Sequence, residues 1–246
     1  MVKFIFMLTK DDSTVADCLD VYDEVRDVGP RWMGFKDIGV GTPVLQELAR
    51  RMHADGRKVV LEVVSTDQEA ELRSVRAGLA IGVDILMGGT HAQTTLPLLC
   101  GSGLLYYPFP GRIIGHPSIL QGSVDEIVES ARELTSLDGV DGLDLLAYRW
   151  TGPVPHLVSA VVAASAGPVI VAGSIESADQ IRIVAERGAS AFTIGGAVFD
   201  RRLVPDGSIR DQVAWALHAA QEAGSRDFDA EPVLSQGDSD NPFIGN

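Results

Sequence analysis

The sequence predicts an α/β fold, a single (β/α)8 TIM barrel, and three observations lead to this prediction. Short apolar segments alternate with amphipathic segments eight times along the chain, which neither an all-α nor an all-β protein would show. The chain has 246 residues, the usual size of one such barrel. The last two apolar segments end in small residues, at Gly173 and Ser174 and at Gly195 and Gly196. An open doubly wound sheet shares the alternation, but no G-x-G-x-x-G motif follows the first apolar segment, where FMLTKDDST stands.

The expected strands are the apolar runs of the chain, and the expected helices are the amphipathic segments between them. In chain order the strands are placed at 3–9, 31–38, 58–65, 83–88, 104–109, 142–149, 168–173 and 190–195. The helices are placed near 14–28, 42–55, 67–81, 92–100, 124–136, 154–165, 177–187 and 208–223.

Several helices carry start and stop signals. Thr66 with Glu69, and Ser123 with Glu126, have the capping-box spacing that satisfies free N–H groups at a helix start. Helices are expected to end where a glycine adopts the left-handed conformation at low cost, at Gly56, Gly82 and Gly188. These signals agree with the alternation and therefore support eight βα units.

The composition excludes several classes of protein. The formal net charge of -14 argues against a nucleic-acid or anionic-membrane partner, because such surfaces need clustered Lys and Arg. The first apolar run is too short for a signal peptide, and the most apolar region, 157–175, is broken by Gly167 and Pro168, which argues against a membrane span. Cys18 and Cys100 show neither metal-ligand spacing nor a disulfide framework. A reduced, cytoplasmic setting is expected.

The chain divides into a barrel at 1–225 and an acidic C-terminal tail at 226–246. The tail holds five acidic residues against one basic residue and shows no periodicity, which predicts a solvated segment. Phe228 and Phe243 leave docking on the barrel or on a neighbouring subunit as an alternative, so a homo-oligomer is compatible with the sequence.

Lys36 and Glu62 are the leading catalytic candidates. Each charge interrupts an otherwise apolar strand, MGFKDIG and VVLEVVS, and a charge inside a barrel strand is costly without a partner. Because the two strands are neighbours, the cation and the anion can pair at the mouth of the barrel. The lysine would then act as a proton donor or imine former and the carboxylate as a base. The alternative is a structural ion pair that fills the interior.

Other candidates follow from the rule that barrel chemistry lies at the carboxyl ends of the strands. Lys10 and Arg149 stand at such ends, and the planar fork of Arg149 suits a carboxylate or phosphate, although an exposed charge is the alternative for both. His91 follows a glycine pair and is a candidate acid, base or hydrogen-bond donor, with an ordinary loop histidine as the alternative. The long loop after the fifth strand, which holds His116, could cover the mouth.

The sequence contains no specific motif for a metal or a cofactor. No H-x-D or H-E-x-x-H spacing supports zinc, and there is no G-x-S-x-G motif for a serine nucleophile. Hard oxygen ligands that would suit Mg²⁺ or Mn²⁺ are present at Asp11, Asp12, Asp37 and Glu62, so a divalent metal stays an alternative.

The two glycine turns predict an anion site. Consecutive strands that end in small residues expose backbone N–H groups at one edge of the sheet, and a barrel often binds phosphate there. The segment AGSIESADQIRIVAERGASAFTIGGAVF, 172–199, also resembles the end of the ribulose-phosphate-binding barrels. This group includes N-acetylmannosamine-6-phosphate epimerase, the histidine-pathway phosphoribosyl isomerase, phosphoribosylanthranilate isomerase and hexulose-phosphate synthase. The resemblance implies that phosphate is bound by Gly173, Ser174, Gly195 and Gly196.

The front of the chain departs from these families. The decarboxylase and synthase branch has D-x-K-x-x-D on the third strand, where this chain has EVVSTD at 62–67 without a lysine. The histidine-pathway isomerases use an aspartate on the first strand, where Lys10 here precedes Asp11 and Asp12.

Three functions are compatible with this pattern. The first is an enzyme that acts on a small phosphorylated sugar or related metabolite, by proton transfer next to a carbonyl (isomerase or epimerase) or by C–C cleavage (aldolase). The second is a flavin oxidoreductase that uses the same turns for the phosphate of FMN, although the chain offers no convincing ring-binding residues. The third is a barrel that binds a phosphometabolite without catalysis, and the charges of Lys36 and Glu62 argue against it.

Overall fold

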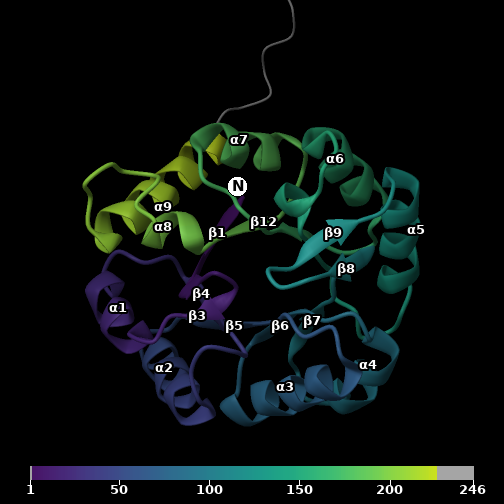
Figure 1. Ribbon diagram of the computed structural model, residues 1–246, viewed down its shortest axis with the longest axis horizontal. Helices are drawn as coiled ribbons and strands as arrows, with labels where there is room; N and C mark the ends of the chain where they lie inside the picture. Colours follow the sequence, from purple (N-terminus) through teal and green to yellow (C-terminus); the bar gives the residue numbers. More distant parts are fainter. Residues whose placement is uncertain (1, 226–246) are drawn as a thin grey trace, which may run out of the picture.

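The computed structural model describes residues 2–225 and shows eight parallel strands in a nearly closed barrel, with helices on the outside (Figure 1). The barrel strands are β1 (Lys3–Met7), β4 (Trp32–Lys36), β5 (Lys58–Val63), β6 (Ile85–Gly88), β7 (Leu105–Tyr107), β10 (Leu143–Leu145), β11 (Val169–Val171) and β12 (Ala191–Ile194). Their spatial order is β10-β11-β12-β1-β4-β5-β6-β7. Backbone hydrogen bonds from Asp141 to Tyr106 (2.9 Å) and from Asp144 to Pro108 (3.1 Å) bridge β7 and β10. The predicted (β/α)8 barrel is therefore confirmed.

The eight expected helices are all present, with shifts of a few residues at their ends. They are α1 (Cys18–Val25), α2 (Thr42–Ala54), α3 (Gln68–Ile81), α4 (Ala92–Leu99), α5 (Val124–Thr135), α6 (Val154–Ala164), α7 (Ala178–Glu186) and α9 (Ile209–Ser225). The predicted tail at 226–246 lies outside the described residues. No helix in the described part of the chain is both long and apolar enough to cross a membrane.

The local signals are confirmed with one exception. Ser123 and Glu126 form a complete capping box at the start of α5. The predicted cap at Thr66 is wrong, because Asp67 is the N-cap of α3 and its side chain accepts a hydrogen bond from the N–H of Ala70 at 2.9 Å. The glycines after α2, α3 and α7 all have positive φ, at Gly56, Gly82 and Gly188.

The sixth strand is shorter than predicted. The expected strand at 142–149 ends at Leu145, and the chain continues as a short 3-10 helix, η1 (Ala147–Arg149). The amide of Arg149 donates to the carbonyl of Leu146 at 3.1 Å, so the backbone turns where a strand was expected. This turn carries the side chain of Arg149 into the mouth of the barrel.

Two hairpins at the carboxyl ends of the strands were not predicted. The first joins β2 (Thr9–Lys10) to β3 (Ser13–Thr14) directly after β1. The second joins β8 (Arg112–Ile114) to β9 (Ile119–Gln121) within the loop after the fifth barrel strand, and it lies inside the ring of helices in Figure 1. A further short helix, α8 (Gly196–Phe199), starts at the glycine pair after β12.

The core has two parts, because successive strand residues face opposite sides of the barrel wall. The larger part lies between strands and helices and includes Phe35, Leu61, Leu143 and Leu145. The smaller part fills the barrel itself with Ile5, Met7, Val60, Ile85, Met87, Tyr107, Ile170 and Ala191. By the same alternation, charged side chains at Lys36, Glu62 and Asp144 project into the interior, above this apolar plug.

Candidate active site

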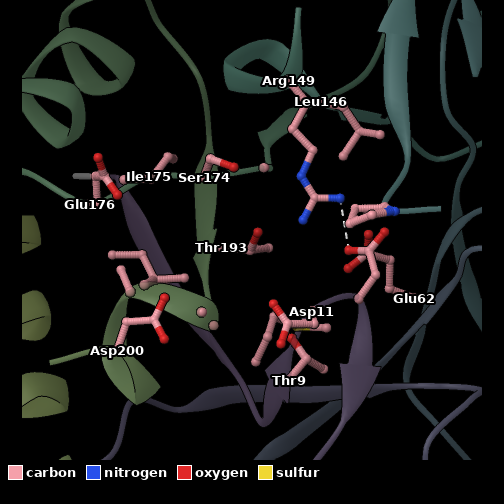
Figure 2. Close-up of a pocket in the computed structure, with 18 of the residues that line it drawn as sticks. Thr9, Asp11, Glu62, Leu146, Arg149, Ser174, Ile175, Glu176, Thr193 and Asp200 are labelled. Atoms are coloured by element: carbon pink, nitrogen blue, oxygen red, sulfur yellow. Dashed lines mark hydrogen bonds and ion pairs between the residues drawn. The ribbon is translucent and has the colours of Figure 1, made fainter. Parts of the chain in front are cut away.

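The candidate site is a cavity of about 440 Å³ at the carboxyl ends of the barrel strands. Side chains from the ends of β1, β4, β5 and β12, from η1 and from the loops after β11 and β12 line it (Figure 2). Lys36 and Glu62 line one side of this cavity, and the Gly173–Ser174 and Gly195–Gly196 turns also line it. The two groups that the sequence singled out therefore share one space.

Lys36 is the centre of the charged side. Its Nζ atom lies 2.6 Å from Oδ1 of Asp12 and 3.2 Å from Oε1 of Glu62. Lys36 and Glu62 are direct partners in the parallel register of β4 and β5, and they are only 4% and 3% exposed. The predicted pairing of the two charges is thus present. Lys36 has a second carboxylate partner, Asp12, which strand order alone does not indicate.

Asp12 is held in place by the β2–β3 hairpin. Asp11 and Asp12 both have positive φ, which makes the turn tight. Thr14 ties the hairpin to β4, since its hydroxyl donates to the carbonyl of Lys36 at 2.8 Å and accepts from the Lys36 amide at 2.9 Å. The hairpin thereby places the Asp12 carboxylate on the ammonium of Lys36.

Three donors converge on the Asp12 carboxylate. Nζ of Lys36 and Nη1 of Arg149 contact Oδ1, the latter at 2.7 Å, and the N–H of Ser118 donates to Oδ2 at 2.8 Å. Burial by itself would raise the pKa of Asp12, but the charges of Lys36 and Arg149 and these hydrogen bonds hold that pKa well below its ordinary value. Asp12 is therefore a fixed anion, suited to position other groups and unsuited to act as a base.

Arg149 connects the charged centre with the β8–β9 hairpin. Its Nη1 also donates to the carbonyl of Ser118 at 3.2 Å, and the indole N–H of Trp150 donates to the carbonyl of Gly122 at 2.9 Å. Ser118 is fully buried, and its neighbour Pro117 lines the cavity. The loop after the fifth strand thus reaches the mouth of the barrel, as its length suggested.

Asp144 is a buried acid that the sequence reading did not single out. It lies in the middle of β10, and neither carboxylate oxygen has a hydrogen-bond partner among residues 2–225. Burial, and next the negative charge of Glu62, raise the pKa of Asp144 well above its ordinary value. The signal that would have found it is the one used for Lys36 and Glu62, a charge inside the apolar run GLDLLA.

The glycine turns form the opposite side of the cavity. Because β11 and β12 are neighbouring parallel strands, the loops that follow them lie side by side. Gly173 and Ser174 both have positive φ, and no backbone carbonyl in residues 2–225 accepts a hydrogen bond from their N–H groups or from those of Gly195 and Gly196. Free N–H groups next to one another suit an anion.

The two glycines after β12 have different surroundings. A Cβ atom at Gly195 would lie 2.7 Å from the carbonyl oxygen of Thr9, so only glycine fits there. A Cβ atom at Gly196 would meet nothing within 4 Å, because this position faces the open cavity.

The rim of the cavity carries paired charges. Lys10, which is half-exposed, contacts Asp200 at 2.7 Å, and Arg202 contacts Glu176 at 2.6 Å. Asp200, Arg202 and Glu176 line the cavity, and none of them was singled out from the sequence. They follow β11 and β12 by several residues, where a sequence pattern does not show which loop side chains face inward.

His91 lies in a separate groove beside α3, α4 and α5. Its Nδ1 is 2.8 Å from Oε2 of Glu71, a buried carboxylate that also accepts the N–H groups of Thr90 and His91. The structure therefore does not bring His91 together with Lys36 and Glu62. Because Glu71 lies on α3, these contacts tie the segment after β6 to that helix.

Of the four carboxylates that would suit a divalent metal, those of Asp11, Asp12 and Glu62 line the cavity. Asp12 and Glu62 contact the ammonium of Lys36, while Asp37 accepts hydrogen bonds from Ser74 and from the amide of Val64. Within residues 2–225, no group of three or more His, Cys, Asp or Glu side chains is arranged to hold a metal ion.

Comparisons with known proteins show the fold. No protein-family model matches the chain, and no curated protein sequence matches it significantly. Similar solved structures include the BexX/CysO complex from Amycolatopsis orientalis, with a TM-score of 0.59 and 18% identity over 91% of this chain and 90% of that one. Orotidine 5'-phosphate decarboxylase from Pyrococcus horikoshii has a TM-score of 0.61 and 11% identity over 89% and 99%. N-acetylmannosamine-6-phosphate 2-epimerase from Clostridium perfringens has a TM-score of 0.60 and 13% identity over 79% and 86%. Identities this low support a common barrel architecture only.

Proposed function

We propose that this protein is an enzyme that binds a small phosphorylated sugar or related carbonyl compound and moves a proton next to the carbonyl, as an isomerase or epimerase. The observation that carries the proposal is that the Lys36–Glu62 pair and the glycine turns line one cavity of about 440 Å³. One end of the cavity suits a phosphate and the other suits acid–base chemistry. Two of the similar structures are enzymes named for phosphorylated compounds, which agrees with this assignment.

Each group has a distinct role in this mechanism. The free N–H groups at Gly173, Ser174 and Gly196 bind the phosphate. The carbonyl of the substrate then points at Lys36, whose ammonium stabilises the negative charge that develops on the oxygen and gives it a proton. Glu62 takes the proton from the adjacent carbon and forms an enediol.

The product depends on where the proton returns. If Glu62 delivers the proton to the neighbouring carbon, and the now neutral Lys36 takes the proton of the second hydroxyl, the carbonyl moves and the enzyme is an isomerase. If solvent instead adds a proton to the same carbon from the other face, and Lys36 takes back the proton it gave to the oxygen, the enzyme is an epimerase. Asp12 acts through Lys36 in both cases, because it holds the ammonium in place.

C–C cleavage through an imine is the second candidate, and it has one observation in its favour. Among the described residues that line the cavity, Lys36 is the one lysine. Imine formation needs a neutral amine, however, and the ammonium here contacts two carboxylates at 2.6 and 3.2 Å. The geometry therefore favours a lysine that acts as an acid.

The test is hydrogen exchange in D₂O with a panel of aldose and ketose phosphates. The proposal predicts that at least one compound gains deuterium at the carbon next to its carbonyl, measured by NMR. The variant Glu62→Gln, which keeps the shape of the side chain, should slow this exchange about a hundredfold or more. Borohydride treatment with substrate distinguishes the second candidate, because only an imine would be trapped on Lys36. If Glu62→Gln exchanges at the wild-type rate, the assignment of the base is wrong.

A further inference from the structure

Asp144 is a carboxylic acid in the barrel interior that the proposed reaction does not use. It is fully buried, and its carboxylate oxygens have no hydrogen-bond partner among residues 2–225. Its strand neighbours Leu143 and Leu145 belong to the outer core, so the alternation of β10 directs Asp144 to the inside of the barrel. A buried carboxylate without a hydrogen-bond partner is unfavourable in its charged form.

The charges around Asp144 are already balanced without it. The neighbouring strands β7 and β11 present Tyr107 and Ile170 to the interior, and neither side chain is a cation. The charged groups that interact with Asp144 are Lys36 on β4, Glu62 on β5, Asp12 in the β2–β3 turn and Arg149 on η1. These are two cations and two anions, and contacts of 2.6, 3.2 and 2.7 Å join them. An ionised Asp144 would therefore add a third negative charge to a group whose two cations already contact Asp12 and Glu62.

We propose that Asp144 carries a proton in the resting protein and acts as a positioning residue. Because Asp144 is neutral, the ammonium of Lys36 keeps its contacts with Asp12 and Glu62. The assignment rests on the proposed function in that Lys36 is the acid and Glu62 the base. The raised pKa of Asp144, caused by burial and by the charge of Glu62, acts in the same direction. When Asp144 ionises, a third carboxylate competes for the ammonium of Lys36, and the contact between Lys36 and Glu62 weakens. Activity should then fall on the alkaline side.

The first test measures stability and needs no substrate. A carboxyl group whose pKa is raised in the folded state binds its proton more tightly there than in the unfolded state. Its contribution is therefore lost as the pH rises from the ordinary value of 3.8 toward the raised pKa. The variant Asp144→Asn has the same shape and cannot ionise, so it should not lose this stability. Over this window the unfolding constant of the wild type should rise relative to that of the variant by up to about tenfold per pH unit.

The control for the stability test is Asp138→Asn, which removes an exposed carboxylate elsewhere on the surface. The unfolding constant of this control should change with pH in the same way as that of the wild type over the same window. If Asp144→Asn instead destabilises the protein by a constant amount above the ordinary carboxyl pKa, Asp144 is ionised and the proposal is overturned.

Two spectroscopic measurements cover the case in which the variant does not fold. Infrared spectra of the wild type labelled with ¹³C-aspartate should show the C=O band of a protonated carboxylic acid at neutral pH, and absence of this band would overturn the proposal. In ¹⁵N-lysine NMR spectra, the ammonium signal of Lys36 should change when the infrared band disappears at higher pH. An ammonium signal that stays unchanged while Asp144 ionises would show that Asp144 does not position Lys36.

The pH profile of deuterium exchange connects this proton with the reaction. In the wild type the alkaline limb should fall at the pH where the infrared band disappears, and Asp144→Asn should move that limb to higher pH. A limb that stays in place in the variant would overturn the positioning role. If no phosphorylated compound exchanges at all while the infrared and NMR results hold, the proposed function fails and the proton on Asp144 stands.

Discussion

Nζ of Lys36 and Oδ1 of Asp12 lie 2.6 Å apart in the interior of the barrel, although 24 residues separate them along the chain. Strand register does not produce this contact, because Asp12 stands in the tight turn of the β2–β3 hairpin. The hairpin is attached to β4 through Thr14, whose hydroxyl donates a hydrogen bond to the carbonyl of Lys36 and accepts one from its N–H. The contact gives Lys36 one orientation and Asp12 a fixed negative charge.

Asp12→Asn should make the protein less stable at neutral pH and less sensitive to acid. The folded protein holds the pKa of Asp12 below its ordinary value of 3.8, so the carboxylate contributes stability above that value, and this contribution is lost as the pH falls through the folded pKa. Unfolding by denaturant, measured from neutral pH down to about pH 2, should show a flatter acid limb for the variant. The exposed residue Asp138 offers a matched control in Asp138→Asn. Equal acid slopes for Asp12→Asn and the wild type would contradict this account.

Lys36→Met should lower both stability and activity. It leaves Glu62 as a buried carboxylate without a cation, and breaking a buried pair on one side costs about 3–5 kcal/mol. The double variant Lys36→Met with Glu62→Gln removes that charge and should recover part of the free energy of unfolding, while exchange activity stays lost. A structural pair without a catalytic role predicts that activity returns with stability, so the double variant separates the two explanations.

Gly196→Asp should abolish phosphate binding and leave the fold intact. A Cβ at this position meets nothing within 4 Å, so the new carboxylate would extend into the space assigned to the phosphate and repel it. Calorimetry with inorganic phosphate, together with the melting temperature, measures the two effects separately. Gly196→Ala is the control for the loss of glycine itself. Gly195 is unsuitable for this experiment, because a Cβ there would collide with Thr9 and disturb the fold. Unchanged phosphate affinity in Gly196→Asp would place the anion elsewhere.

Arg149→Lys should loosen the β8–β9 hairpin. Nη1 of Arg149 bridges Asp12 and the carbonyl of Ser118, and the side chain of a lysine ends one bond short of this atom. Hydrogen bonds to charged groups are worth about 1.5–3 kcal/mol, so amide exchange over 112–121 should become at least tenfold faster. Arg112→Lys, at an exposed position of the same hairpin, is the matched control. Equal rates of amide exchange over 112–121 in both variants would show that Arg149 does not anchor the hairpin.

Lys36 and Glu62 show what could be predicted from the sequence. Each interrupts an apolar strand, and consecutive parallel strands of a βα repeat are neighbours, so their pairing followed from local pattern and order alone. The glycine turns after the last two strands were predicted in the same way. Asp144 carries the same signal as Lys36, but the expected strand at 142–149 places it near the amino end, whereas the observed strand ends at Leu145.

The contacts that complete the site depend on tertiary structure. Periodicity reports which residues of a strand share a face, but it does not report how a loop folds back over the barrel. The β2–β3 turn that brings Asp12 to Lys36, and the hairpin that brings Ser118 to Asp12, bring together groups 24 and 106 residues apart. The strand pattern alone therefore determined the barrel and one ion pair. The folded loops decided which carboxylate holds the lysine, where Arg149 lies, and that His91 lines a different groove, because these positions follow from contacts between distant segments.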